Sequence, residues 1–125
     1  MPDDYAEYAE LRRRMPPTMM LNTGEHEYTA AGHKLLCESG VDIIQPDPVW
    51  CGGLTELRKI AAVAAAHGKR IIPHVGGQYA YHFLASFPDL FLAEFPVMGA
   101  RATKLFHSMD RFPSARPCPK RSGSP

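Results

Sequence analysis

Hydrophobic positions along the chain follow two patterns that alternate. Short runs rich in apolar and β-branched residues predict strands over residues 18–23, 41–45, 70–73 and 90–93. Apolar positions at helical spacing predict helices over residues 29–39, 54–67 and 78–86, and a further helix from Asp3–Asp4 to Arg14. Strands therefore alternate with helices through most of the sequence.

This alternation predicts parallel strands joined by helical crossovers, which is an α/β fold. The strand–helix unit recurs at the short interval typical of a (β/α)8 TIM barrel, which has eight units in about 250 residues. The chain has 125 residues and about four predicted βα units, so we expect a partial barrel over residues 1–98. Residues 99–125 are rich in proline and arginine and are expected to form a disordered tail.

Composition narrows the class of protein. Hydrophobic residues make up 45% of the chain and the net charge is +1, which is typical of a globular protein and argues against a nucleic-acid partner. No apolar run is long enough to span a bilayer, so no membrane partner is expected. The three cysteines lack a C-x-x-C motif, which favours free thiols and a cytoplasmic location.

An ionisable residue follows each predicted strand. These residues are Glu25, Asp47, His74 and Glu94. In a parallel α/β barrel the carboxyl ends of the strands form the rim on which the active site is built. The sequence therefore predicts that the four side chains surround one site.

All of these residues except His74 also have a structural explanation, whereas His74, between a buried strand and a pair of glycines, is the better catalytic candidate. Glu25 has the position of an acid in the first turn of a helix, where the helix dipole favours a negative charge. Asp47 lies between two prolines, as a turn residue often does, and Glu94 has the position of a cap on its strand. His26 can equally be a solvated histidine. Cys51, beside Gly52 and Gly53, is a candidate nucleophile, but a small buried residue is the simpler interpretation.

Taken as a set, the residues are suited to one reaction type. A carboxylate such as Glu25 suits a hard divalent cation, and a histidine oriented by an aspartate moves protons near neutral pH. A further acid, such as Glu94, can donate a hydrogen bond to a developing oxyanion. The combination indicates proton abstraction next to a carboxylate, with a metal stabilising the enediolate.

Several blocks of the chain are similar in sequence to one enzyme family. They read T-G-E-H-E-Y from Thr23, D-I-I-Q-P-D-P-V-W-C-G-G-L-T-E-L-R-K-I from Asp42, I-I-P-H and Y-A-Y-H-F further on, and L-A-E-F ending at Phe95. Together they resemble the C-terminal half of the L-rhamnonate dehydratases, which belong to the mandelate racemase subgroup of the enolase superfamily. The resemblance covers roughly residues 2–98.

The resemblance implies a role for each candidate residue. Glu25 matches the third carboxylate ligand of one Mg²⁺ ion, and His26 matches a histidine near the substrate. His74 matches the general base and acid, Asp47 the residue that orients it, and Glu94 an acid that hydrogen-bonds to the substrate. The implied reaction converts L-rhamnonate into 2-keto-3-deoxy-L-rhamnonate, in a family whose full-length members are homo-oligomers.

Departures from the family leave alternatives open. The sequence lacks the first two metal-ligand carboxylates and the capping domain, so we expect these residues to be inactive by themselves. One alternative is a truncated half-barrel without enzymatic activity, and another is a superfamily dehydratase or racemase acting on a different acid sugar. A metal-dependent hydrolase on another barrel would need a histidine cluster that the sequence does not contain.

Overall fold

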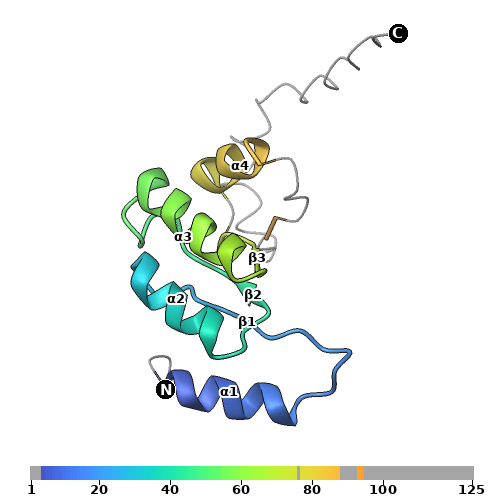
Figure 1. The fold of residues 1–125 in the computed structure, drawn as a ribbon. Helices are drawn as coiled ribbons and strands as arrows, with labels where there is room; N and C mark the ends of the chain where they lie inside the picture. Colours follow the sequence, from blue (N-terminus) through green and yellow to red (C-terminus); the bar gives the residue numbers. More distant parts are fainter. Residues whose placement is uncertain (1–3, 76, 88–92, 95–125) are drawn as a thin grey trace, which may run out of the picture. The chain divides into compact units, whose positions relative to one another are not determined.

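Parallel strands form a sheet at the centre of the described structure. The computed structural model describes residues 4–75, 77–87 and 93–94. Its strands are β1 (Asn22–Thr23), β2 (Ile43–Ile44) and β3 (Arg70–Ile71), which lie in the order β1–β2–β3 and pair in parallel. The α/β class with parallel strands and helical crossovers is therefore confirmed (Figure 1).

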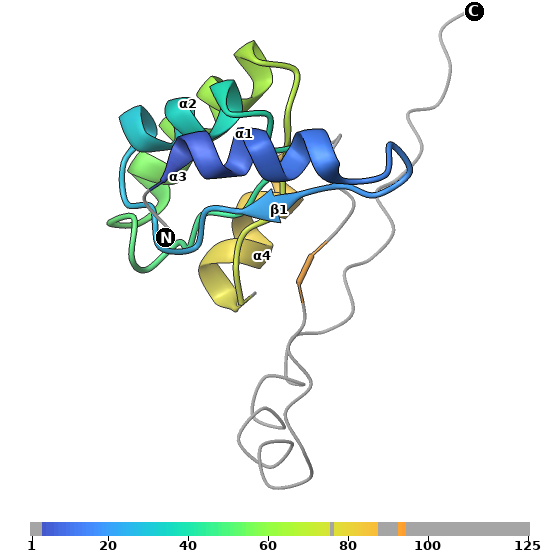
Figure 2. The same ribbon diagram turned by 90° about the horizontal axis from the view of Figure 1, so that it is seen from below.

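Helices begin and end close to the predicted positions. They are α1 (Tyr5–Arg14), α2 (Ala30–Glu38), α3 (Leu54–Ala66) and α4 (Gln78–Ala85). Asp4 caps α1 by accepting hydrogen bonds from backbone amides, and Thr29 caps α2 in the same way, because the first amides of a helix have no partner within it. Helices α1, α2 and α3 pack beside one another in chain order (Figures 1 and 2).

The strands are shorter than predicted. The predicted strand over 18–23 begins as a turn, in which the amide of Met19 donates to the carbonyl of Pro16. Parallel pairing nevertheless extends beyond β2 and β3, because the amide of His74 donates to the carbonyl of Pro46 at 2.9 Å. Residues 90–92 of the fourth predicted strand and the whole tail over 99–125 lie outside the described residues, and the domain boundary after residue 98 stays a prediction.

The core lies between the sheet and the helices. The largest buried apolar side chains come from β2, α3 and the segment before β2, and include Val41, Ile44, Leu57 and Ile60. The apolar positions at helical spacing in α3 include Leu57 and Ile60, which are buried, and Leu54, which is 39% exposed. Leu54 is the first residue of the helix, one turn before the first buried position, Leu57.

A buried histidine fixes the chain directly after β1. His33 is fully buried on α2, its Nδ1 lies 2.8 Å from the carbonyl oxygen of Thr29, and burial lowers its pKa. A Cβ on Gly24 would lie 3.3 Å from His33 Nε2 and 3.2 Å from the amide nitrogen of Gln45, and Gly24 also has a φ of +130°. Only glycine combines that conformation with so close an approach, so Gly24 leads the chain from β1 toward Glu25.

In the part of the chain that the structure describes, no helix is both long and apolar enough to cross a membrane.

Candidate active site

The two carboxylates of T-G-E-H-E-Y point to different partners. Glu27 accepts hydrogen bonds from the hydroxyl of Tyr5 at 2.7 Å and from the backbone amides of Tyr28 and Thr29, just before α2. Burial opposes ionisation of Glu27, but these donors outweigh it and lower its pKa. Glu27 therefore anchors the start of α2, which leaves Glu25 to face the ends of the neighbouring strands.

Asp47 and His74 form a hydrogen-bonded dyad across adjacent strand ends. Asp47 Oδ2 lies 3.1 Å from His74 Nδ1, and both side chains are largely buried. Asp47 Oδ1 accepts from the backbone amides of Val49 at 2.7 Å and Trp50 at 3.0 Å. Asp47 is thus fixed by its own turn before it contacts the imidazole, and it fixes the orientation of that ring in turn.

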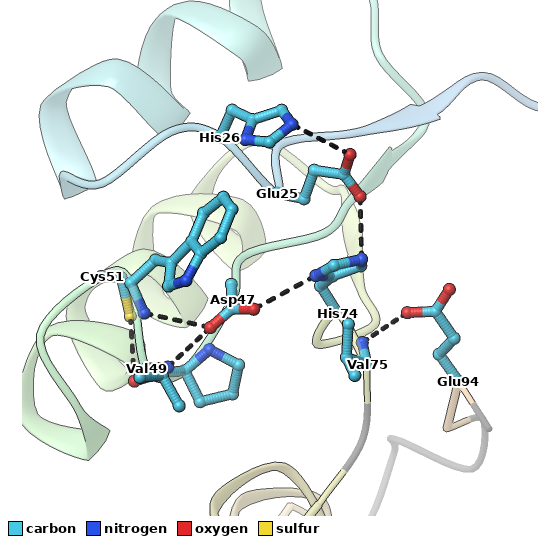
Figure 3. Close-up of polar contacts among 10 residues, drawn as sticks. Glu25, His26, Asp47, Val49, Cys51, His74, Val75 and Glu94 are labelled. Atoms are coloured by element: carbon cyan, nitrogen blue, oxygen red, sulfur yellow. Dashed lines mark hydrogen bonds and ion pairs between the residues drawn. The ribbon is translucent and has the colours of Figure 1, made fainter. Parts of the chain in front are cut away.

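Glu25 approaches the other nitrogen of the same ring. Its Oε2 lies 2.9 Å from His74 Nε2, and its Oε1 lies 3.3 Å from His26 Nε2 (Figure 3). The imidazole of His74 therefore lies between two carboxylates that come from separate strand ends. The structure brings Glu25, Asp47 and His74 into direct contact and places His26 beside them.

Glu94 lies one residue away from this group. Its Oε2 accepts a hydrogen bond from the backbone amide of Val75, which directly follows His74 (Figure 3). Within the described residues, Glu94 makes no hydrogen bond or ion pair with the side chain of Asp47 or His74. Glu25, Asp47 and His74 thus lie at the same ends of the parallel strands, and Glu94 contacts the backbone directly after His74.

Comparison with known proteins identifies the family. Residues 1–115 match the family described as enolase C-terminal domain-like. The chain belongs to this family. The predicted enolase-type fold, with parallel strands like those of a partial TIM barrel, is therefore confirmed.

Relatives of this enolase-type domain include acid-sugar enzymes. The chain is 53% identical over 106 residues to L-rhamnonate dehydratase of Saccharopolyspora erythraea, a match covering 84% of the chain and 27% of that protein. A rhamnonate dehydratase of Gibberella zeae complexed with Mg has a TM-score of 0.68 at 47% identity, over 75% of this chain and 23% of the other. The 3,6-anhydro-D-galactonate cycloisomerase of Zobellia galactanivorans has a TM-score of 0.70 at 34% identity, over 83% and 30% of the two chains. The chain thus spans about a quarter of the length of these relatives.

Metal-binding groups are sparse in this part of the enolase-type domain. Among residues 4–75, 77–87 and 93–94, no three His, Cys, Asp or Glu side chains are arranged to hold a metal ion. Asp47 is occupied by the dyad and by its own turn, whereas Glu25, within the described part of the chain, contacts only the ring nitrogens of His74 and His26 and is the carboxylate of this group best placed to bind a cation. The described residues fit one ligand of a magnesium site and do not fit a complete one.

Cys51 lies beside the site but does not have the properties of a nucleophile. Its side chain is buried, with Sγ 3.8 Å from the carbonyl oxygens of Pro48 and Gly53. Burial raises the pKa of its thiol, so the reactive thiolate is disfavoured. The interpretation of Cys51 as a small buried residue is confirmed.

Sequence reasoning overlooked Trp50. The indole ring is about half exposed and lies with its centroid 5.1 Å from that of His26. The signal was available, because Trp50 is the only tryptophan and follows Asp47 by three residues in the Q-P-D-P-V-W block. Only the fold shows that its ring reaches the neighbouring strand end.

We predict that Val75→Gly stabilises the chain by about 1 kcal/mol. Val75 has a φ of +58°, and the left-handed region costs a residue with a Cβ roughly 1–2 kcal/mol, more than the entropy that glycine loses on folding. Urea unfolding followed by circular dichroism measures the change. Val63→Gly is the control, because Val63 lies within α3, where glycine is destabilising. Equal losses of stability in both variants would contradict the prediction.

Proposed function

We propose that this chain supplies the acid–base side of a Mg²⁺-dependent acid-sugar dehydratase. The substrate in this proposal is L-rhamnonate and the product is 2-keto-3-deoxy-L-rhamnonate. The main support is the geometry of His74, whose Nδ1 contacts Asp47 while Nε2 faces Glu25. The kinship with L-rhamnonate dehydratases at 53% and 47% identity supports the choice of substrate.

His74 is the proposed proton carrier. The Asp47 carboxylate accepts a hydrogen bond from His74 Nδ1 and so keeps a proton on that nitrogen. Nε2, the nitrogen that faces Glu25, is then the atom that exchanges a proton with the substrate. His74 Nε2 removes the proton from the carbon next to the substrate carboxylate. The imidazolium, stabilised by Asp47, then donates a proton to the departing 3-hydroxyl group, which leaves as water.

Glu25, His26 and Glu94 are the proposed contacts to metal and substrate. Glu25 would be one oxygen ligand of Mg²⁺, and a bound cation would supply stabilisation of the enediolate oxygens. His26 faces the substrate beside Glu25, and Glu94 hydrogen-bonds to the substrate carboxylate or enediolate. The remaining ligands of the cation would come from outside the described residues.

The 125 residues alone are proposed to be inactive. One carboxylate does not make a tight Mg²⁺ site, because such sites use several oxygen ligands in octahedral geometry. We therefore expect no measurable dehydration of L-rhamnonate by this chain in magnesium buffer. Isothermal titration is expected to show no sub-millimolar affinity for Mg²⁺.

A chimera tests the activity directly. The 106-residue matching segment of the Saccharopolyspora erythraea L-rhamnonate dehydratase is replaced by the corresponding residues of this chain. The chimera is expected to form 2-keto acid from L-rhamnonate with a kcat/KM within about tenfold of that enzyme, a loss of at most about 1.4 kcal/mol. The unmodified enzyme is the positive control.

Two results would contradict the proposal. One is a chimera that is folded by circular dichroism but dehydrates neither L-rhamnonate nor another acid sugar. The other is turnover by the 125-residue chain alone that disappears in its His74→Ala variant, which would show a more complete site than we propose.

A further inference from the structure

Several aromatic rings lie together beside the dyad. The centroid of Trp50 lies 5.1 Å from that of His26, with an angle of 32° between the rings, and 6.3 Å from that of Tyr28. Trp50 follows β2, whereas His26 and Tyr28 follow β1, so the rings meet across two strand ends. We call these three side chains the aromatic wall.

The aromatic wall is joined to the site by a closed circuit of contacts. Trp50 donates its backbone amide to Asp47 Oδ1, and Asp47 Oδ2 contacts His74. His74 Nε2 contacts Glu25, Glu25 contacts His26, and the His26 ring faces Trp50. The wall and the acid–base residues therefore hold one another in position on the same side of the strand ends.

Much of the aromatic wall is left open. Trp50 is 48% exposed and Tyr28 is 51% exposed, whereas Phe83 in the core is 3% exposed. Large apolar rings that stay open beside polar catalytic groups are typical of ligand pockets, in which aromatic surfaces surround a few polar groups. The position of the wall indicates that a ligand reaching His74 also reaches these rings.

We propose that the aromatic wall packs against an apolar end of the acid sugar and selects a 6-deoxy substrate. This inference rests on the proposed function. A methyl group at C6 gains by burial against the rings, whereas a hydroxyl group there loses hydrogen bonds to water. A second carboxylate at C6 is disfavoured further, because the faces of aromatic rings carry negative charge.

The expected selectivity is modest. One methyl group in an apolar pocket contributes roughly 1–3 kcal/mol, so the preference for L-rhamnonate over its 6-hydroxy analogue is expected to be about tenfold or more in kcat/KM. The preference should appear mainly in KM, because the methyl group lies away from the reacting carbons. Diacids with a carboxylate at C6 are expected to be the poorest substrates.

Variants of the chimera test the wall. Trp50→Ala is expected to raise KM for L-rhamnonate about tenfold and to change the kinetics with the 6-hydroxy analogue little, so that the selectivity is lost. Trp50→Phe keeps an aromatic ring and is expected to retain most of the selectivity. Leu35→Ala is the control, because Leu35 is similarly exposed on α2 and is not part of the wall.

The outcomes separate the two proposals. If Trp50→Ala lowers kcat/KM equally for both sugars, Trp50 is only structural, and the inference fails while the dehydratase proposal stands. If the unsubstituted chimera dehydrates no acid sugar, the proposed function fails and the inference falls with it.

Discussion

Replacing His74 with alanine in the chimera is expected to lower kcat for L-rhamnonate by roughly 10,000-fold. A positioned general acid or base contributes about 10²–10⁴ in rate, and His74 is proposed to act as both in one turnover. KM is expected to change by no more than a few-fold, because alanine removes proton transfer and leaves the other substrate contacts. Steady-state formation of 2-keto acid measures both constants.

His67→Ala is the matched control for this prediction. His67 follows the last residue of α3, its Nδ1 lies 2.8 Å from the carbonyl oxygen of Val63, and it makes no contact with the dyad. Its removal is expected to leave kcat unchanged within about twofold, which is less than 0.5 kcal/mol. Similar losses of kcat in both variants would mean that histidine removal disturbs folding, and would contradict the assigned role of His74.

Asp47→Asn separates orientation from proton transfer. The amide oxygen of asparagine can still accept from the turn amides of Val49 and Trp50, so the fold of the turn is expected to persist. Its NH₂ group would face His74 Nδ1 and favour the wrong tautomer of the imidazole. We therefore expect Asp47→Asn to lower kcat less than His74→Ala does and to change KM little. The same kinetic assay measures both variants.

Leu57→Ala is expected to destabilise the chain by about 3 kcal/mol. Leu57 is fully buried in the cluster that joins α3 to the sheet, and truncation of a buried leucine costs about 2–5 kcal/mol through lost burial and the cavity left behind. The loss is large compared with the roughly 5–15 kcal/mol that stabilises a typical domain. Urea unfolding should show a midpoint lowered by about 1–2 M, given the usual dependence of free energy on denaturant.

Leu54→Ala provides the same substitution on the same helix. Leu54 begins α3 and is 39% exposed, so its truncation removes less buried surface than that of Leu57. We expect a loss below about 1 kcal/mol. Comparable losses in the two variants would contradict the position of the core between α3 and the sheet.

The positions of the helices could be predicted closely because their signals are local. The predicted helices begin at Asp3–Asp4 and at residue 29, where Asp4 and Thr29 cap α1 and α2 in the structure, and Gly40 and Gly68 follow the ends of α2 and α3. Strand lengths could not be predicted as well. A strand exists only where a neighbouring strand accepts its hydrogen bonds, and the apolar run before Asn22 forms a turn in the described structure.

The sequence also predicted which strand ends carry Glu25, Asp47 and His74, because parallel connection places every strand end on one edge. It did not distinguish the roles of the two carboxylates in T-G-E-H-E-Y. Glu25 and Glu27 are two residues apart and chemically similar. Glu27 is held by the amides of the two residues that follow it and by the hydroxyl of Tyr5. Only the contact with Tyr5 joins segments distant in sequence.

By itself, the sequence determined the α/β class, the order of the elements and the identity of the ionisable residues at the strand ends, because periodicity, caps and turns act over a few residues. The tertiary structure alone decided that His74 lies between Asp47 and Glu25 and that Trp50 meets His26. These contacts join residues more than twenty positions apart. Their distances depend on strand pairing and core packing, which no local pattern in the chain specifies.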